Sequence, residues 1–127
     1  MIRILVIDDD DDFRSMLRTA LEQDGYRVEE ARNGHEGLQR YVVAPTDIVM
    51  TDLLMPEREG LETITALRQI NPQVKIIAIS GGGATGRLNF LPLARMLGAL
   101  RTLQKPFTLQ ELQEVVREVV RQETPCL

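Results

Sequence analysis

Apolar and polar positions follow two periods along this chain, one typical of strands and one typical of helices. Short apolar runs rich in β-branched residues predict strands, and apolar residues at every third or fourth position predict amphipathic helices. The predicted strands are 3–7, 26–30, 47–51, 74–79 and 100–103. The fourth of them is apolar apart from Lys75, which is typical of a central strand covered on both faces.

Helices are predicted between these strands from apolar spacing and from capping residues. The apolar stripes consist of Phe13, Met16, Leu17, Ala20 and Leu21, then Leu38 and Tyr41, then Leu61, Ile64, Leu67 and Ile70, and finally Leu109, Leu112, Val115, Val116, Val119 and Val120. Asn33 with Glu36, and Thr108 with Glu111, have the spacing of N-terminal capping pairs. The glycine-rich segment 81–86 leaves the start of the fourth helix undefined.

Five strand–helix pairs in strict alternation predict an α/β fold with a doubly wound, five-stranded parallel sheet and right-handed crossovers. In such folds, ligands bind outside the carboxyl ends of the strands. The residues that follow each predicted strand are therefore the candidates for chemistry.

Carboxylate, hydroxyl and ammonium groups follow four of the five strands. Asp8 and Asp9 follow the first strand, Asp52 the third, Ser80 the fourth and Lys105 the fifth. Three carboxylates at one edge would repel one another unless they share a cation, and Mg²⁺ takes oxygen ligands of this kind. With an ammonium and a hydroxyl nearby, such a site has the parts that stabilise a phosphoryl group in transit. Aspartate can also accept a phosphoryl group covalently.

The net charge of −4 comes from 15 basic and 19 acidic residues among 127, and five of the acidic residues are consecutive at 8–12. Without these five, 14 acidic residues face 15 basic ones, so the acidity is local to the end of the first strand. We expect Asp10, Asp11 and Asp12 to favour the first turn of a helix rather than to extend a metal site. The only histidine, His35, is expected to lie on the surface.

The composition argues against several classes of protein. A pI near 5.0 without a basic tract gives no general reason to bind nucleic acid or an anionic membrane. No apolar run approaches the ~20 residues that span a bilayer, and the single cysteine, Cys126, cannot form an internal disulfide. We expect one cytoplasmic domain with 43% hydrophobic residues around one core.

The chain resembles the receiver domain of two-component response regulators. The motifs that carry the resemblance lie at 4–9, 47–52, 55–56, 60–61, 76–80 and 103–107. It covers residues 3 to about 120 and implies a flavodoxin-like (βα)5 fold with strand order 2-1-3-4-5.

The resemblance also implies roles for particular residues. Asp52 would be the phosphoacceptor, and Ser80 and Lys105 would contact the phosphoryl oxygens. The ligands of Mg²⁺ would be Asp8, Asp9, Asp52 and the main-chain carbonyl of Leu54. Ser80 and Thr102 would occupy the switch positions, although the family usually has an aromatic residue at the second. The bond between Lys105 and Pro106 is usually cis in this family.

From this resemblance we expect a single-domain response regulator, with a receiver domain at 1–123 and a short tail at 124–127. The phosphoryl donor would be a sensor histidine kinase or a histidine phosphotransfer protein. The output would be a downstream protein or a phosphorelay, reached through a change in the fourth loop and helix and the fifth strand. We expect no enzymatic activity beyond self-directed phosphoryl transfer and autodephosphorylation, and a monomer or a weak phosphorylation-dependent dimer.

Three alternatives stay open at this stage. A Mg²⁺-dependent phosphohydrolase resembling the haloacid dehalogenase class would use Asp8 and Asp10 as an Asp-x-Asp pair, but position 12 is Asp where that class has Thr. A flavodoxin-like flavin domain fits poorly, because carboxylates would repel the flavin phosphate and the chain has no Trp. A receiver fold could also serve as a binding module without phosphorylation.

Overall fold

A computed structural model describes residues 1–53, 59–81, 95–96 and 98–122 of the chain. Five parallel strands form one sheet in the order β2-β1-β3-β4-β5. The strands are β1 (Arg3–Ile7), β2 (Arg27–Ala31), β3 (Ile48–Asp52), β4 (Lys75–Gly81) and β5 (Arg101–Lys105). The helices are α1 (Asp11–Gln23), α2 (Gly34–Val43), α3 (Glu59–Ile70) and α5 (Leu109–Arg121). The predicted fold class and strand order are confirmed.

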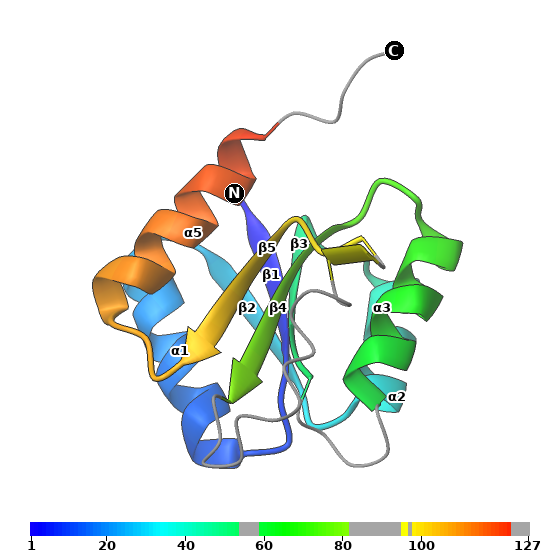
Figure 1. Ribbon diagram of the computed structural model, residues 1–127, viewed down its shortest axis with the longest axis horizontal. Coiled ribbons are helices and arrows are strands. Elements are labelled where there is room, and N and C mark those ends of the chain that lie inside the picture. Colours follow the sequence, from blue (N-terminus) through cyan, green and yellow to red (C-terminus); the bar gives the residue numbers. More distant parts are fainter. Residues whose placement is uncertain (54–58, 82–94, 97, 123–127) are drawn as a thin grey trace.

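The sheet lies between two layers of helices. Helices α1 and α5 cover one face, and α2 and α3 cover the other (Figure 1). Side chains alternate accordingly along β1, where Leu5 and Ile7 join the core under α2 and α3 while Ile4 and Val6 join the core under α1 and α5. Strand β4 is buried apart from its two end residues, as its apolar run predicts. Among the helices that the structure describes, none is long and apolar enough to cross a membrane.

Four strands extend further toward their carboxyl ends than predicted, and one of them is β2, which ends at Ala31. Asp52 is the last residue of β3, Ser80 lies within β4, and Lys105 is the last residue of β5. The reason is that backbone pairing continues past the apolar residues, with Ser80 opposite Gln104 and Gly81 opposite Lys105. Strand ends therefore depend on the neighbouring strand as well as on hydrophobicity.

The helix starts agree with the capping prediction. Asp10 is the N-cap of α1, and its side chain accepts hydrogen bonds from the backbone N–H groups of Asp12 and Phe13. Thr108 and Glu111 form a reciprocal capping box at α5. Three apolar positions assigned to helix stripes are wrong, because Met16, Ile70 and Leu109 are each about half exposed. Most of the predicted fourth helix lies outside the described residues, and only 95–96 are described there, as helical. The tail at 124–127, which includes Cys126, also lies outside them.

Candidate metal centre at the carboxyl edge of the sheet

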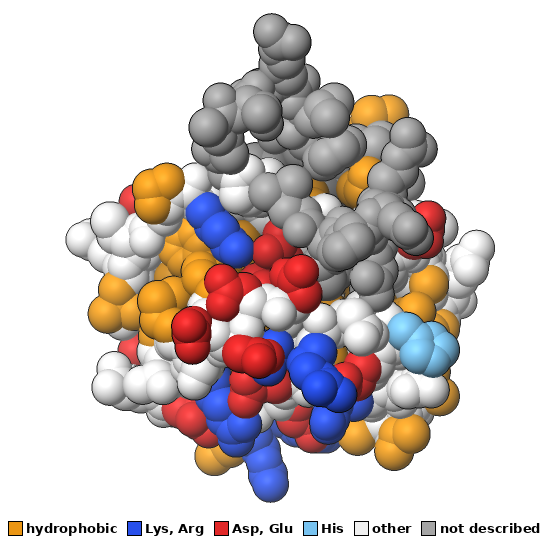
Figure 2. Space-filling view, turned by 90° about the horizontal axis from the view of Figure 1, so that it is seen from below, with side chains coloured by type: hydrophobic (Ala, Val, Ile, Leu, Met, Phe, Trp, Pro, Cys, Tyr) orange, Lys and Arg blue, Asp and Glu red, His pale blue; other side chains and the backbone are white. Residues whose placement is uncertain are grey.

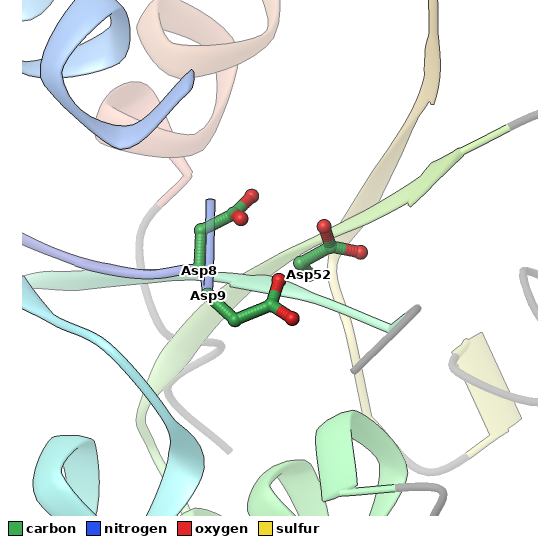
Figure 3. Close-up of side chains that lie close together, drawn as sticks. All are labelled: Asp8, Asp9 and Asp52. Atoms are coloured by element: carbon green, nitrogen blue, oxygen red, sulfur yellow. The ribbon is translucent and has the colours of Figure 1, made fainter. Parts of the chain in front are cut away.

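Neighbouring strands bring three carboxylates together at the carboxyl edge of the sheet. Strands β1 and β3 pair in register, with Ile7 opposite Thr51, so the residues that follow this pair lie side by side. One carboxylate oxygen from each of Asp8, Asp9 and Asp52 lies within 4.8 Å of the other two. Figure 3 shows the carboxyl groups of Asp8 and Asp9 extending from adjacent backbone positions toward the side on which Asp52 lies.

Asp8 carries the most deeply buried of these carboxylates. Its side chain is 1% exposed, and its Oδ1 atom accepts a hydrogen bond of 2.8 Å from the backbone N–H of Asp10. Its Oδ2 atom is buried and accepts no hydrogen bond from any residue that the structure describes. Burial, together with the negative charge of Asp52, raises the pKa of Asp8 to about 6, against the opposing effects of the Asp10 N–H and Lys105. A cation close to Oδ2 would therefore stabilise the charged form of Asp8.

Lys105 supplies the positive charge that the structure places at this centre. Its Nζ atom donates a hydrogen bond of 3.0 Å to Oδ2 of Asp52 and lies 3.5 Å from Oδ2 of Asp8. Burial lowers the pKa of Lys105, but the hydrogen bond to Asp52 and the charges of both aspartates outweigh burial and raise it. Among the residues that the structure describes, the cluster therefore holds three carboxylates and one ammonium.

The donor set fits a hard divalent cation. Its oxygen atoms come from carboxylates, which Mg²⁺ prefers, and one of them is the buried Oδ2 of Asp8 without a hydrogen bond. Asp9 is exposed, so the cluster is open to solvent on one side. Figure 2 looks onto this edge and shows acidic side chains gathered near its centre, with basic and apolar side chains beside them.

The other predicted site residues that the structure describes lie on β4 and β5. Ser80 is buried near the end of β4, the strand between β3 and β5. Thr102 is partly buried in β5, opposite Ala78. The bond between Lys105 and Pro106 is cis, as the resemblance implies. The main-chain carbonyl of Leu54 lies outside the described residues.

Two structural features that sequence reasoning missed fix the backbone of this edge. Arg14 is about nine-tenths buried and donates hydrogen bonds to the main-chain carbonyl of Asp8 at 2.7 Å and to Glu30 at 3.0 Å. Gly60 lies against the end of β3, because a Cβ atom there would meet the carbonyl oxygen of Asp52 and lie 2.6 Å from the Cα atom of Leu53. Arg14 carries no sequence signal for such a role, and the motif at 60–61 does not indicate the close approach of Gly60 to β3.

The other aspartates of the acidic run at 8–12 and the histidine lie outside the cluster. Asp10 accepts hydrogen bonds from the first turn of α1, and Asp11 and Asp12 are exposed in that turn. The preference for the start of a helix over a wider metal site is confirmed, with Asp11 and Asp12 in the first turn and Asp10 at the cap before it. Use of Asp10 as a cap also removes the second carboxylate of an Asp-x-Asp pair from the centre. His35 is exposed on α2, as expected.

Comparisons with known proteins agree with the geometry. Residues 4–117 match the family model of the response regulator receiver domain. The chain is 35% identical over 120 residues to the response regulator receiver protein CpdR of Brucella abortus (strain 2308), with 94% of this chain and 98% of that protein covered. It is 35% identical over 118 residues to the chemotaxis protein CheY of Thermotoga maritima, covering 92% and 96% of the two chains.

Longer relatives and solved structures match as well. The chain spans about half the length of the response regulator MprA of Mycolicibacterium vanbaalenii, at 36% identity over 124 residues and 98% of this chain. The receiver domain protein of Clostridium thermocellum superposes with a TM-score of 0.83 at 30% identity, covering 94% of each chain. The structure of TrrA of Thermotoga maritima in complex with Mg²⁺ and BeF gives a TM-score of 0.81 at 32% identity, covering 94% of this chain and 99% of that one. This chain belongs to the response regulator receiver domains of two-component systems.

Proposed function

We propose that this protein accepts a phosphoryl group on Asp52 and uses the resulting acyl phosphate to control a partner protein. The observation that carries the proposal is the surroundings of the Asp52 side chain. This carboxylate is buried at the end of β3, shares its site with two other carboxylates, and accepts a hydrogen bond from Lys105. Receiver domains are signalling switches that generally bind Mg²⁺ at an acidic pocket, and this cluster could hold it.

The proposed reaction is a phosphoryl transfer from a phosphohistidine of a sensor kinase or phosphotransfer protein. An oxygen of Asp52 attacks the phosphorus atom, the P–N bond of the donor breaks, and its electron pair stays on the imidazole nitrogen. Lys105 and the hydroxyl of Ser80 stabilise the negative charge on the phosphoryl oxygens. Asp8, Asp9 and Asp52, with the carbonyl of Leu54 as the resemblance implies, would hold Mg²⁺, which would neutralise part of that charge when bound.

The proposal includes a self-limited signal and a partner. Water attacks the acyl phosphate and releases inorganic phosphate, which returns Asp52 to its carboxylate form. Phosphorylation would change the conformation at Ser80, at Thr102 and in the connection between β4 and β5, and the partner would recognise this change. Most of that connection lies outside the described residues. We further propose a cytoplasmic location and either a monomer or a weak dimer that forms on phosphorylation.

Incubation with acetyl phosphate and Mg²⁺ tests the assignment directly. We expect intact-mass spectrometry to show a gain of one phosphoryl group by the unaltered protein and none by Asp52→Ala. Asp47→Ala is the matched control, because Asp47 is an exposed aspartate at the opposite end of the same sheet, and it should gain the group normally. A gain of mass by Asp52→Ala would show that the phosphoacceptor lies elsewhere.

A second assay separates a switch from a phosphohydrolase. We expect repeated turnover of a simple phosphate ester, such as p-nitrophenyl phosphate, to be undetectable, because Asp10 caps α1 instead of facing the acidic cluster. Sustained turnover that Asp8→Asn abolishes would contradict the proposal and favour the hydrolase alternative.

A further inference from the structure

The ring of Phe13 contacts the ammonium group of Lys105. The Nζ atom lies 3.8 Å from the centre of the ring, well inside the distance at which a cation is attracted to an aromatic face. Phe13 lies in the first turn of α1, directly after the two exposed aspartates of that turn. Phe107 supports the ring from the loop before α5, with the ring centres 5.9 Å apart and the planes at 79°.

Phe13 therefore covers one side of the ammonium group. Among the described residues, the other groups that face Nζ are the carboxylates of Asp52 and Asp8. The side chain of Lys105 is only one-quarter exposed, so the contact with the ring is partly shielded from water. A shielded contact between a cation and a ring is stronger than an exposed one.

A neutral ring has an advantage over another acidic residue at this place. The carboxylates of Asp8 and Asp52 already face one ammonium group, and a further negative charge would compete with Asp52 for that ammonium. The ring attracts the ammonium without adding net charge to the cluster. It also restrains a side chain that has four rotatable bonds and would otherwise pay an entropic cost for staying over Asp52.

We propose that Phe13 is a positioning residue that holds the ammonium group of Lys105 over Asp52 and thereby speeds phosphoryl transfer to Asp52. This inference rests on the proposed function of Asp52 and Lys105. The ring itself touches neither Asp52 nor a phosphoryl group in the proposal, and it acts only through the lysine.

Two variants separate the effect of the ring from the effect of its volume. Phe13→Leu keeps an apolar side chain but removes the aromatic face, and Phe13→Tyr keeps the face. In NMR spectra of the unphosphorylated protein, the ring current of Phe13 should displace the ε-methylene proton resonances of Lys105. We expect Phe13→Leu to move these resonances toward those of an exposed lysine, and Phe13→Tyr to leave them nearly in place.

The same variants are then compared for the rate of mass gain with acetyl phosphate and Mg²⁺. We expect a rate about threefold to tenfold lower for Phe13→Leu and within about twofold of the unaltered protein for Phe13→Tyr. Urea unfolding confirms that each variant folds, and Phe13→Ile replaces the leucine variant should that variant unfold.

The outcomes distinguish this inference from the function on which it rests. Absence of any mass gain by the unaltered protein overturns the proposed function and the rate effect with it. Unchanged Lys105 resonances in the folded leucine variant overturn the positioning role alone. Equal rates for the leucine variant and the unaltered protein, or equally low rates for the leucine and tyrosine variants, also overturn it.

Discussion

The charged residues at the two ends of the sheet differ in their burial and in their pairing. At the amino end, Asp47 is exposed and accepts a hydrogen bond of 2.8 Å from the backbone N–H of Arg3. The guanidinium of Arg3 in turn pairs with Glu29 at 3.0 Å, and both side chains are about one-third exposed. At the carboxyl end, Asp8 and Asp52 are buried beside each other and share Lys105.

The difference separates charges that stabilise the fold from charges that are maintained for chemistry. An exposed pair costs little to form and contributes little, typically below about 1 kcal/mol. Buried like charges destabilise the folded state unless a cation compensates them. Because the carboxyl end concentrates carboxylates where they oppose folding, its composition is better explained by a bound cation and a reacting group than by stability.

Replacement of Asp8 by asparagine gives the largest expected effect. Asp8→Asn should lower the affinity for Mn²⁺, used as a probe for Mg²⁺, on the order of 100-fold, since a ligand is lost. Without metal, the same variant should be more stable by about 1 kcal/mol, because a buried carboxylate beside Asp52 becomes neutral. Electron paramagnetic resonance titration of Mn²⁺ and urea unfolding in EDTA measure the two effects.

Asp47→Asn is the control from the amino end. It should leave the Mn²⁺ affinity unchanged and lower the stability slightly, because the backbone N–H of Arg3 then bonds to a neutral oxygen. Equal changes in metal affinity for the two variants would remove the distinction between the ends of the sheet.

The stability of the metal-free protein should depend on pH through Asp8. Its pKa rises from an ordinary value of about 3.9 to about 6 in the folded state, so the folded protein binds more protons between these values. The contribution of Asp8 is therefore favourable at low pH and is lost as the pH rises from about 4 to about 7, by about 2 kcal/mol. Urea unfolding in EDTA across this range should show the loss.

The difference between the unaltered protein and Asp8→Asn isolates this contribution. The hydrogen bond from Arg18, together with Arg14, lowers the pKa of Glu30. Glu30 therefore stabilises the folded protein above the ordinary glutamate pKa, so its contribution changes with pH in the direction opposite to that of Asp8. Glu30 is unchanged in the variant, so its contribution cancels. A parallel pH dependence of the two proteins would contradict the assignment to Asp8.

The fold could be predicted from the sequence because each element carries its own local signal. Apolar runs of strand length, capping pairs such as Thr108 with Glu111, and strict alternation fix the order of strands and helices. The grouping of Asp8, Asp9 and Asp52 followed from one further rule, that parallel strands end at the same edge.

Contacts that depend on side-chain direction could not be predicted in the same way. Arg14 looks like any solvated arginine of a helix, and only the packed structure shows its guanidinium on the carbonyl of Asp8. Phe13 has the spacing of a core residue, which hides its contact with Lys105. Met16 has the same spacing but is half exposed, because an apolar stripe does not fix which of its members the neighbouring elements cover.

The last test compares two arginines, Arg14 near the carboxyl end of the sheet and Arg3 at its amino end. Arg14→Met removes the donors to the carbonyl of Asp8 and to Glu30 from a buried position, so stability should fall by about 1–2 kcal/mol. Arg3→Met breaks an exposed pair with Glu29 and should cost no more than about 0.5 kcal/mol. Urea unfolding in EDTA measures both changes.

Metal affinity shows whether Arg14 merely stabilises the fold or also sets the position of the acidic cluster. The guanidinium of Arg14 donates a hydrogen bond to the main-chain carbonyl of Asp8 and so fixes the backbone at this metal ligand. Loss of a group that orients a metal ligand weakens metal binding, so we expect Arg14→Met to weaken Mn²⁺ binding by roughly tenfold. Arg14→Lys keeps the charge but not the forked donor, so it should recover only part of the affinity. If Arg14→Met lowers the stability but leaves the Mn²⁺ affinity unchanged, this arginine has only a structural role, like Arg3. Metal binding at the carboxyl end would then depend on the carboxylates and Lys105 alone.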